Sequence, residues 1–200
     1  GQRTPHTQDS LTACLPPGHQ LGDERVPDQR GGVGLLDAQH RAVPRVIGPV
    51  PTEDMMHLLD EAHRQEHSLE VQLPFLQYVL GEFSLVPVVV GDATPREVYD
   101  VISMLWNGPE TLLIMSSDLS HYHDYETATR LDRATSHAIE TLAFEKIGYE
   151  HACGRNPVSG LLLYARKHGL SVENLDLRNS GDTAGPRDQV VGYGTYVINR

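Results

Sequence analysis

The chain has 200 residues with 27 acidic and 16 basic side chains, and its formal net charge of −11 argues against a surface that binds nucleic-acid phosphates. Apolar residues make up 39 % and charged residues 22 % of the chain, which is typical of a globular domain rather than a disordered one. No apolar run approaches the ~20 residues of a bilayer span, no secretory-signal pattern is visible, and the two cysteines suit a reducing compartment. We therefore expect a single cytoplasmic domain, with no membrane or nucleic-acid partner.

The first 50 residues differ in character from the rest of the chain. They hold seven glycines and six prolines, and their only apolar stretches lie at residues 33–36 and 46–47. This composition predicts loops or weakly ordered structure. We expect residues 1–50 to be an atypical part of the domain, and residues 51–200 to contain its regular elements.

Hydrophobic periodicity and turn signals predict alternating helices and strands after residue 51. Ser68 is expected to cap the second helix, and Pro74 to kink or restart it. Thr94, Pro95 and Glu97 together predict a capped helix start. Helices are predicted over residues 52–63, 68–80, 94–106, 126–144 and 156–168, and strands over 83–90, 111–115, 172–177 and 190–198. The alternation predicts an α/β fold with a central mixed or largely parallel sheet flanked by helices.

Asp118 and His121 follow directly after the predicted strand 111–115. In open α/β sheets, ligands bind beyond the carboxyl ends of strands. A histidine at that place can act as a general base or a metal ligand, and a nearby aspartate can fix its tautomer. The alternative is that Asp118 caps a turn and His121 is a surface residue.

Cys153 lies immediately before the helix predicted from residue 156. A helix N-terminus and the neighbouring Arg155 favour the thiolate, which binds metals or attacks electrophiles. The alternative is a buried, inert cysteine. Cys14 has no such context.

Five motifs, in this order, resemble the Memo family, whose members include AmmeMemoRadiSam system protein B. They are EHSLEVQLPFL at residues 66–76, VPVVVG at 86–91, SSDLSH at 116–121, CGRNP at 153–157 and VVGYG at 190–194. The resemblance implies a fold like that of the class III extradiol ring-cleaving dioxygenases. Relative to the family pattern, the amino-terminal part is shortened or degraded.

The resemblance also implies a metal site. Pro5-His6 and His40-Arg41 retain parts of two amino-terminal family motifs, so His6, His40 and Cys153 take the places of the metal ligands. Asp118 and His121 are then expected in the same cleft as the catalytic residues, with His121 as the acid–base histidine. A ligand set of two histidines and one cysteine suits iron or copper.

We consider three hypotheses for the chain. The first is an iron- or copper-dependent, dioxygenase-like oxidoreductase acting on an unknown small molecule. The second is a non-catalytic module that binds a peptide or protein in the same cleft. The third treats residues 1–50 as a truncated or frame-disrupted remnant, which would leave a sheet edge exposed.

Overall fold

The computed structural model describes residues 68–106, 108–109 and 111–199, together with the backbone of residues 9–15, 35–36 and 42–43. The predicted helix 52–63 and the candidate ligands His6 and His40 lie outside the described residues. The described helices are α2 (Leu73–Leu80), α3 (Pro95–Leu105), α4 (Tyr125–Glu140) and α5 (Arg155–His168). The strands are β1 (Asp9–Leu15), β2 (Leu35–Leu36), β3 (Ala42–Val43), β4 (Ser84–Val90), β5 (Leu112–Ser116), β6 (His121–His123), β7 (Ser171–Asn179) and β8 (Val190–Asn199). Short 3₁₀ turns occupy Phe144–Lys146 and Ser180–Asp182.

Two three-stranded sheets dominate the described part of the chain, with strand orders β4-β1-β5 and β6-β8-β7. Every pairing among the described strands is antiparallel, so the expectation of a mixed or largely parallel sheet is wrong for this part of the chain. In the first of these sheets the reason is β1, which lies between β4 and β5 and runs antiparallel to both. β4 and β5 therefore run in the same direction, joined through α3, without pairing with each other.

β1 itself is a second correction, because the sequence of residues 1–50 predicts loops. Its seven residues pair with β4 from Asp9 opposite Val90 to Leu15 opposite Ser84. Alternate positions Leu11, Ala13 and Leu15 are apolar, which is the period-2 pattern of a strand. The pattern is short, and it lies in a region rich in glycine and proline.

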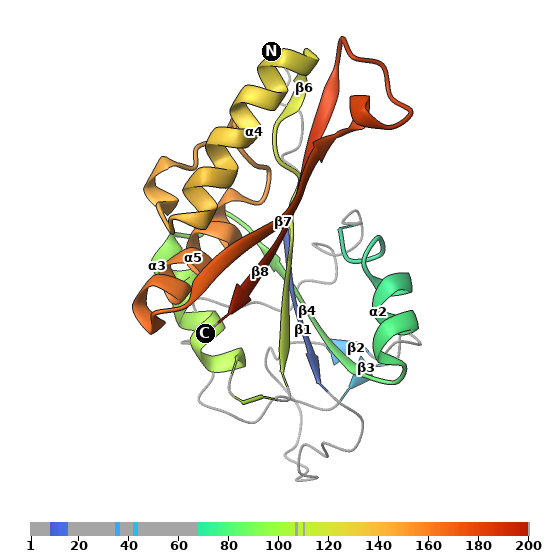
Figure 1. The fold of residues 1–200 in the computed structure, drawn as a ribbon. Coiled ribbons are helices and arrows are strands. Elements are labelled where there is room, and N and C mark those ends of the chain that lie inside the picture. Colours follow the sequence, from blue (N-terminus) through green and yellow to red (C-terminus); the bar gives the residue numbers. More distant parts are fainter. Residues whose placement is uncertain are drawn as a thin grey trace, which may run out of the picture.

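Helices α3, α4 and α5 lie on one side of the two sheets, and α2 lies on the other (Figure 1). Side-chain alternation along β5 explains this arrangement. Leu113 and Met115 pack with the core of Val90, Val98 and Ile102 beneath α3, while Ile114 packs on the opposite face with Phe83 and Leu85 beneath α2. A third core joins α4, α5 and the chain around the strand ends through Leu119, Ala138, Ile139, Ile147, Ala152 and Leu162.

Local sequence signals set most helix boundaries. Thr94 accepts a hydrogen bond from the backbone of Glu97 and forms the predicted capping box, with a proline in the first turn. Ser68, in contrast, does not cap α2. That helix begins at Leu73, after a turn over residues 68–72, because Pro74 suits only the first turn of a helix. Helix α4 ends at Glu140 rather than 144, since Leu142 adopts a positive φ of 56°.

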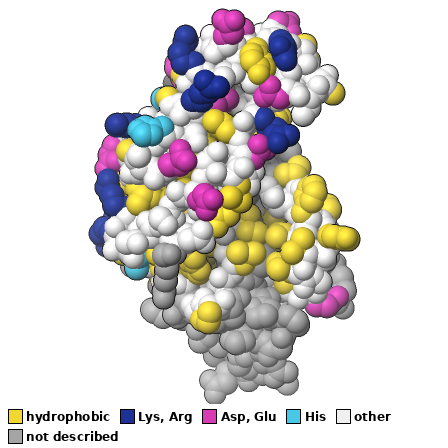
Figure 2. All heavy atoms as spheres, in the orientation of Figure 1, with side chains coloured by type: hydrophobic (Ala, Val, Ile, Leu, Met, Phe, Trp, Pro, Cys, Tyr) yellow, Lys and Arg dark blue, Asp and Glu magenta, His cyan; other side chains and the backbone are white. Residues whose placement is uncertain are grey.

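The outer face of α2 is apolar. Phe75, Tyr78 and Val79 expose most of their side chains, and Figure 2 shows hydrophobic side chains gathered over this helix. No helix in the described ranges is long and apolar enough to cross a membrane.

Candidate metal centre

The carboxyl end of β5 is held in place by a group of serine hydroxyls. Ser116 donates a hydrogen bond to the carbonyl of Ser68 and accepts one from the Gln72 amide, each at 3.3 Å. The Ser117 hydroxyl donates to the carbonyl of Asp118 at 2.7 Å and accepts from the backbone of Gly154 at 2.8 Å. The strand end is thereby joined both to the turn before α2 and to the start of α5.

Cys153 is brought to this strand end by the residue that follows it. A Cβ on Gly154 would lie 2.5 Å from the Cβ of Ser117, so only glycine permits the approach. The Cys153 sulfur accepts a hydrogen bond from the backbone N–H of Asp118 at 3.3 Å and lies 3.6 Å from the Ser117 hydroxyl. The thiol can in turn donate to the carbonyl of Asp118 at 3.7 Å, so the sulfur is held against both backbone groups of Asp118.

Asp118, His121 and Cys153 converge at this point. A carboxylate oxygen, an imidazole nitrogen and the sulfur all lie within 4.8 Å of one another. His121 Nε2 is 3.4 Å from Asp118 Oδ2, and the two side chains are 31 % and 48 % exposed, so solvent reaches the cluster. The three donor types match those that hold iron, copper or zinc in proteins, so this donor set fits a transition metal. The cluster is the one group of at least three such donors among the described residues.

A bulged strand orients His121. In β6, His121 pairs with Val191 and His123 with Val190, so one residue is extra between them. That residue, Tyr122, has a φ of 58° and an exposed side chain. A residue other than glycine rarely adopts a positive φ. β-Bulges of this kind concentrate beside functional sites, because they redirect side chains.

Sequence analysis missed two residues of this region, Asp132 and Tyr193. Asp132 is buried in α4, and one of its oxygens accepts a hydrogen bond from the backbone of Ser120; burial raises the pKa of Asp132. Burial, and then the nearby Asp118, raise the pKa of Tyr193. The signal for Asp132 is visible in the sequence, because this carboxylate falls four residues after Ala128 on the face of the helix that is otherwise buried.

The structure thus brings three of the five predicted site residues together, namely Asp118, His121 and Cys153. His6 and His40 stay predictions. The Arg155 guanidinium, which was expected to act on the thiol, stacks over the ring of Tyr149 at 3.5 Å from its centroid.

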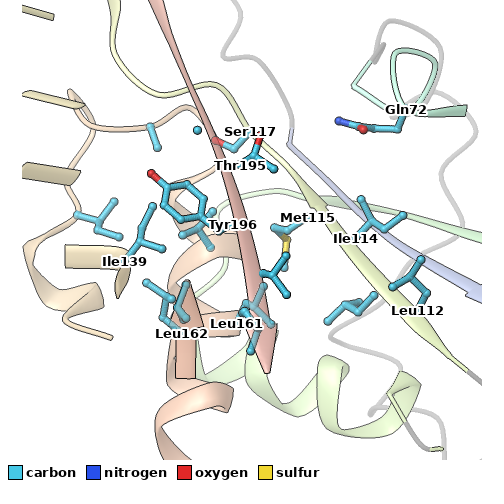
Figure 3. Close-up of a pocket in the computed structure, with 18 of the residues that line it drawn as sticks. Gln72, Leu112, Ile114, Met115, Ser117, Ile139, Leu161, Leu162, Thr195 and Tyr196 are labelled. Carbon is cyan, nitrogen blue, oxygen red and sulfur yellow. The ribbon is translucent and has the colours of Figure 1, made fainter. Parts of the chain in front are cut away.

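An apolar cavity of about 460 Å³ lies beside the cluster, between β5 and β8. Figure 3 shows Ser117 and Thr195 near one end of it, with leucines of α5 and the side chains of β5 along its walls. Its apolar lining includes Leu113, Met115, Leu161, Leu162 and Ile198. Ser117 lines the cavity and also contacts Cys153, so the cavity lies next to the cluster.

Together, the fold and the cluster define an α/β protein with a thiol, an imidazole and a carboxylate gathered at a strand end. The comparisons make the assignment more specific, because the Memo-like protein family matches residues 49–197. The chain therefore belongs to the Memo family.

Curated relatives agree with this assignment. A MEMO1 family protein of Thermoplasma volcanium is 37 % identical over an alignment of 149 residues that covers 70 % of this chain and 55 % of that protein. A MEMO1 family protein of Saccharolobus solfataricus is 34 % identical over 159 residues, covering 72 % and 55 % of the two chains. One of Thermotoga sp. is 35 % identical over 178 residues, covering 83 % and 61 %. The chain spans between half and two thirds of the length of these relatives.

Proposed function

We propose that this chain forms part of an iron- or copper-binding centre and acts as an oxidoreductase on a small molecule. The observation that carries the proposal is the convergence of Asp118, His121 and Cys153 within 4.8 Å at the end of β5. A bound iron or copper ion would supply redox chemistry and open coordination positions for a substrate.

Each residue of the cluster has a distinct part in the proposal. Cys153 is the thiolate ligand, because the Asp118 N–H points at its sulfur. His121 accepts a proton from the substrate, and Asp118, at 3.4 Å from Nε2, stabilises the imidazolium that forms. His6 and His40 complete the ligand set that the family resemblance implies, and they await a test by substitution.

The apolar cavity indicates the kind of substrate. A volume of about 460 Å³ is within the range of small-molecule pockets, and its lining is mostly aliphatic. A substrate with an apolar body would fill the cavity and present a polar group at the Ser117 end, next to Cys153. We also propose that the fold is related to that of the class III extradiol dioxygenases. The protein would act in a reducing compartment, in which the thiol stays reduced.

Metal binding is the first test. The purified chain is incubated with Fe²⁺ or Cu⁺ without oxygen, and bound metal is measured by elemental analysis after gel filtration. We expect about one equivalent, with a rise in Tm of roughly 5–10 °C at a hundredfold excess over Kd. Cys153→Ser should lose most of the metal, whereas Cys14→Ser, the matched control at the chain's other cysteine, should retain it.

Two outcomes contradict the proposal. One is binding far below one equivalent, which would favour the non-catalytic binding module. The other is equal metal content in wild type and Cys153→Ser, which would remove Cys153 from the centre. Oxygen consumption by the loaded wild type, measured with an added reductant, then tests the oxidoreductase part. His121→Gln should reduce the rate per bound metal ion if His121 acts on protons.

A further inference from the structure

A buried carboxylate contacts the segment that joins two residues of the candidate metal cluster, Asp118 and His121. Asp132, in the middle of α4, is only 3 % exposed. Its Oδ1 accepts a hydrogen bond from the backbone N–H of Ser120 at 3.0 Å, and its Oδ2 has no hydrogen-bond partner among the residues that the structure describes. Burying a carboxylate with one oxygen unpaired is costly. The neighbouring buried positions of the same helix face are small residues, so packing alone gives no reason for an acid here.

The segment that Asp132 contacts is the one that carries Asp118 and His121. Leu119 donates its N–H to the carbonyl of Gly192 at 2.9 Å, and Gly192 donates its N–H to the carbonyl of Ser120 at 2.8 Å. These two bonds join the segment to β8, while the bond from Ser120 to Asp132 joins it to α4. The last backbone group before His121 is thus held from both sides.

Gly192 provides the space for this arrangement. A Cβ at position 192 would overlap the carboxylate of Asp132, so any other residue would displace it. Helix α4, strand β8 and the segment before His121 therefore pack together where Asp132 lies directly against Gly192.

We propose that Asp132 is a positioning residue, whose carboxylate, fitted against Gly192, fixes the Ser120 backbone so that His121 and Asp118 face Cys153. Its role is exerted through Ser120, since Asp132 is buried and its Oδ1 accepts a hydrogen bond from that backbone. The inference rests on the proposed function only for its metal-binding readout.

The test compares two substitutions of Asp132 in the full chain. Asp132→Leu keeps the branched shape of the side chain, with larger end groups, and removes the acceptor, whereas Asp132→Asn keeps an oxygen at the same place. Thr135→Val is the matched control, because Thr135 is also buried, one turn further along α4, and within the described part of the chain its hydroxyl bonds only to the helix carbonyl of Leu131. Asp132→Ala is a second acceptor-free variant should Asp132→Leu fail to fold, since alanine is the best helix former.

Two quantities are measured. The first is hydrogen exchange of the Ser120 amide in the metal-free protein, which should be at least tenfold faster in Asp132→Leu and within about threefold of wild type in Asp132→Asn. The second is the Kd for Co²⁺, followed by its thiolate absorption, which should rise by about 10- to 100-fold in Asp132→Leu and little in Asp132→Asn. Thr135→Val should lower Tm and leave both quantities near the wild-type values.

The positioning role is overturned if Asp132→Leu keeps wild-type exchange at Ser120. It is equally overturned if Thr135→Val changes Co²⁺ affinity as much as Asp132→Leu does at a similar Tm. Failure of the proposed function is separate from both, because wild type would then bind no Co²⁺ while the exchange comparison still decides whether Asp132 holds Ser120.

Discussion

Substitution of Gly154 by alanine tests how Cys153 reaches the strand end. Gly154 has an ordinary φ of −81°, so alanine causes no backbone strain there. Its Cβ, however, would lie 2.5 Å from the Cβ and 2.6 Å from the hydroxyl oxygen of Ser117. Either Ser117 or the start of α5 must move, and the 2.8 Å hydrogen bond from Gly154 to Ser117 is lost.

The expected cost follows from these contacts. Overpacking of a well-packed site costs about 1–3 kcal/mol, and loss of one neutral hydrogen bond costs about 1 kcal/mol. Alanine also lowers the conformational entropy of the unfolded chain, and this stabilises the folded state by about 0.4–1 kcal/mol. The net loss in the free energy of unfolding is therefore about 2 kcal/mol, or roughly 4–8 °C in Tm for a chain of this size.

Urea unfolding of four proteins measures this effect: wild type, Gly154→Ala, Ser117→Gly and the double variant. Ser117→Gly removes both clashing atoms, so the double variant should be more stable than the sum of the two single losses predicts. Gly91→Ala is the control, because a Cβ at Gly91 meets nothing within 4 Å, and its stability should stay within about 0.5 kcal/mol of wild type.

The same proteins are assayed for Fe²⁺ binding, which should weaken in Gly154→Ala because Cys153 moves with its neighbour. The steric argument fails if Gly154→Ala is as stable as Gly91→Ala. It also fails if the losses of Gly154→Ala and Ser117→Gly simply add.

Further predictions concern the packing and the capping of the helices. Gly160→Ala places a Cβ against Val98 where α5 crosses α3; overpacking outweighs the gain in helix propensity, and we expect a net loss of about 1 kcal/mol. Combining it with Val98→Gly, which removes both the Cβ and the Cγ1 that clash, should relieve the overlap, and urea unfolding should then show a positive coupling between the two sites. Asp124 caps α4 by accepting a hydrogen bond from the backbone of Thr127, so Asp124→Ala should lower Tm by a few degrees at pH 7. That hydrogen bond holds the pKa of Asp124 below its ordinary value; its stabilisation is therefore present above the unfolded pKa and is lost as the pH falls through the lower, folded pKa. The difference in urea midpoint between wild type and Asp124→Ala should accordingly shrink below about pH 4, and a constant difference would contradict this assignment.

Local chemistry determined most of the elements from residue 83 onward. The Thr94 capping box and the run of β-branched residues in β4 depend on neighbours within a few positions, so their structure is predictable from sequence. Errors arose where a distant partner decides the outcome. The seven residues of β1 form a strand between β4 and β5, and this insertion makes the pairings of that sheet antiparallel.

The candidate site divides in the same way. The sequence by itself indicated Asp118, His121 and Cys153 one at a time, from their places after a strand and before a helix, because those places depend on local structure. Their convergence within 4.8 Å joins residues 35 positions apart, and Ser117 and Gly154 permit it through a contact that no local pattern encodes. Asp132 and Gly192 were missed for the same reason, since a buried acid and a glycine have meaning only once α4 and β8 meet. Composition and motifs thus determined the family and the types of functional group in the candidate site, whereas tertiary packing alone decided which side chains face one another.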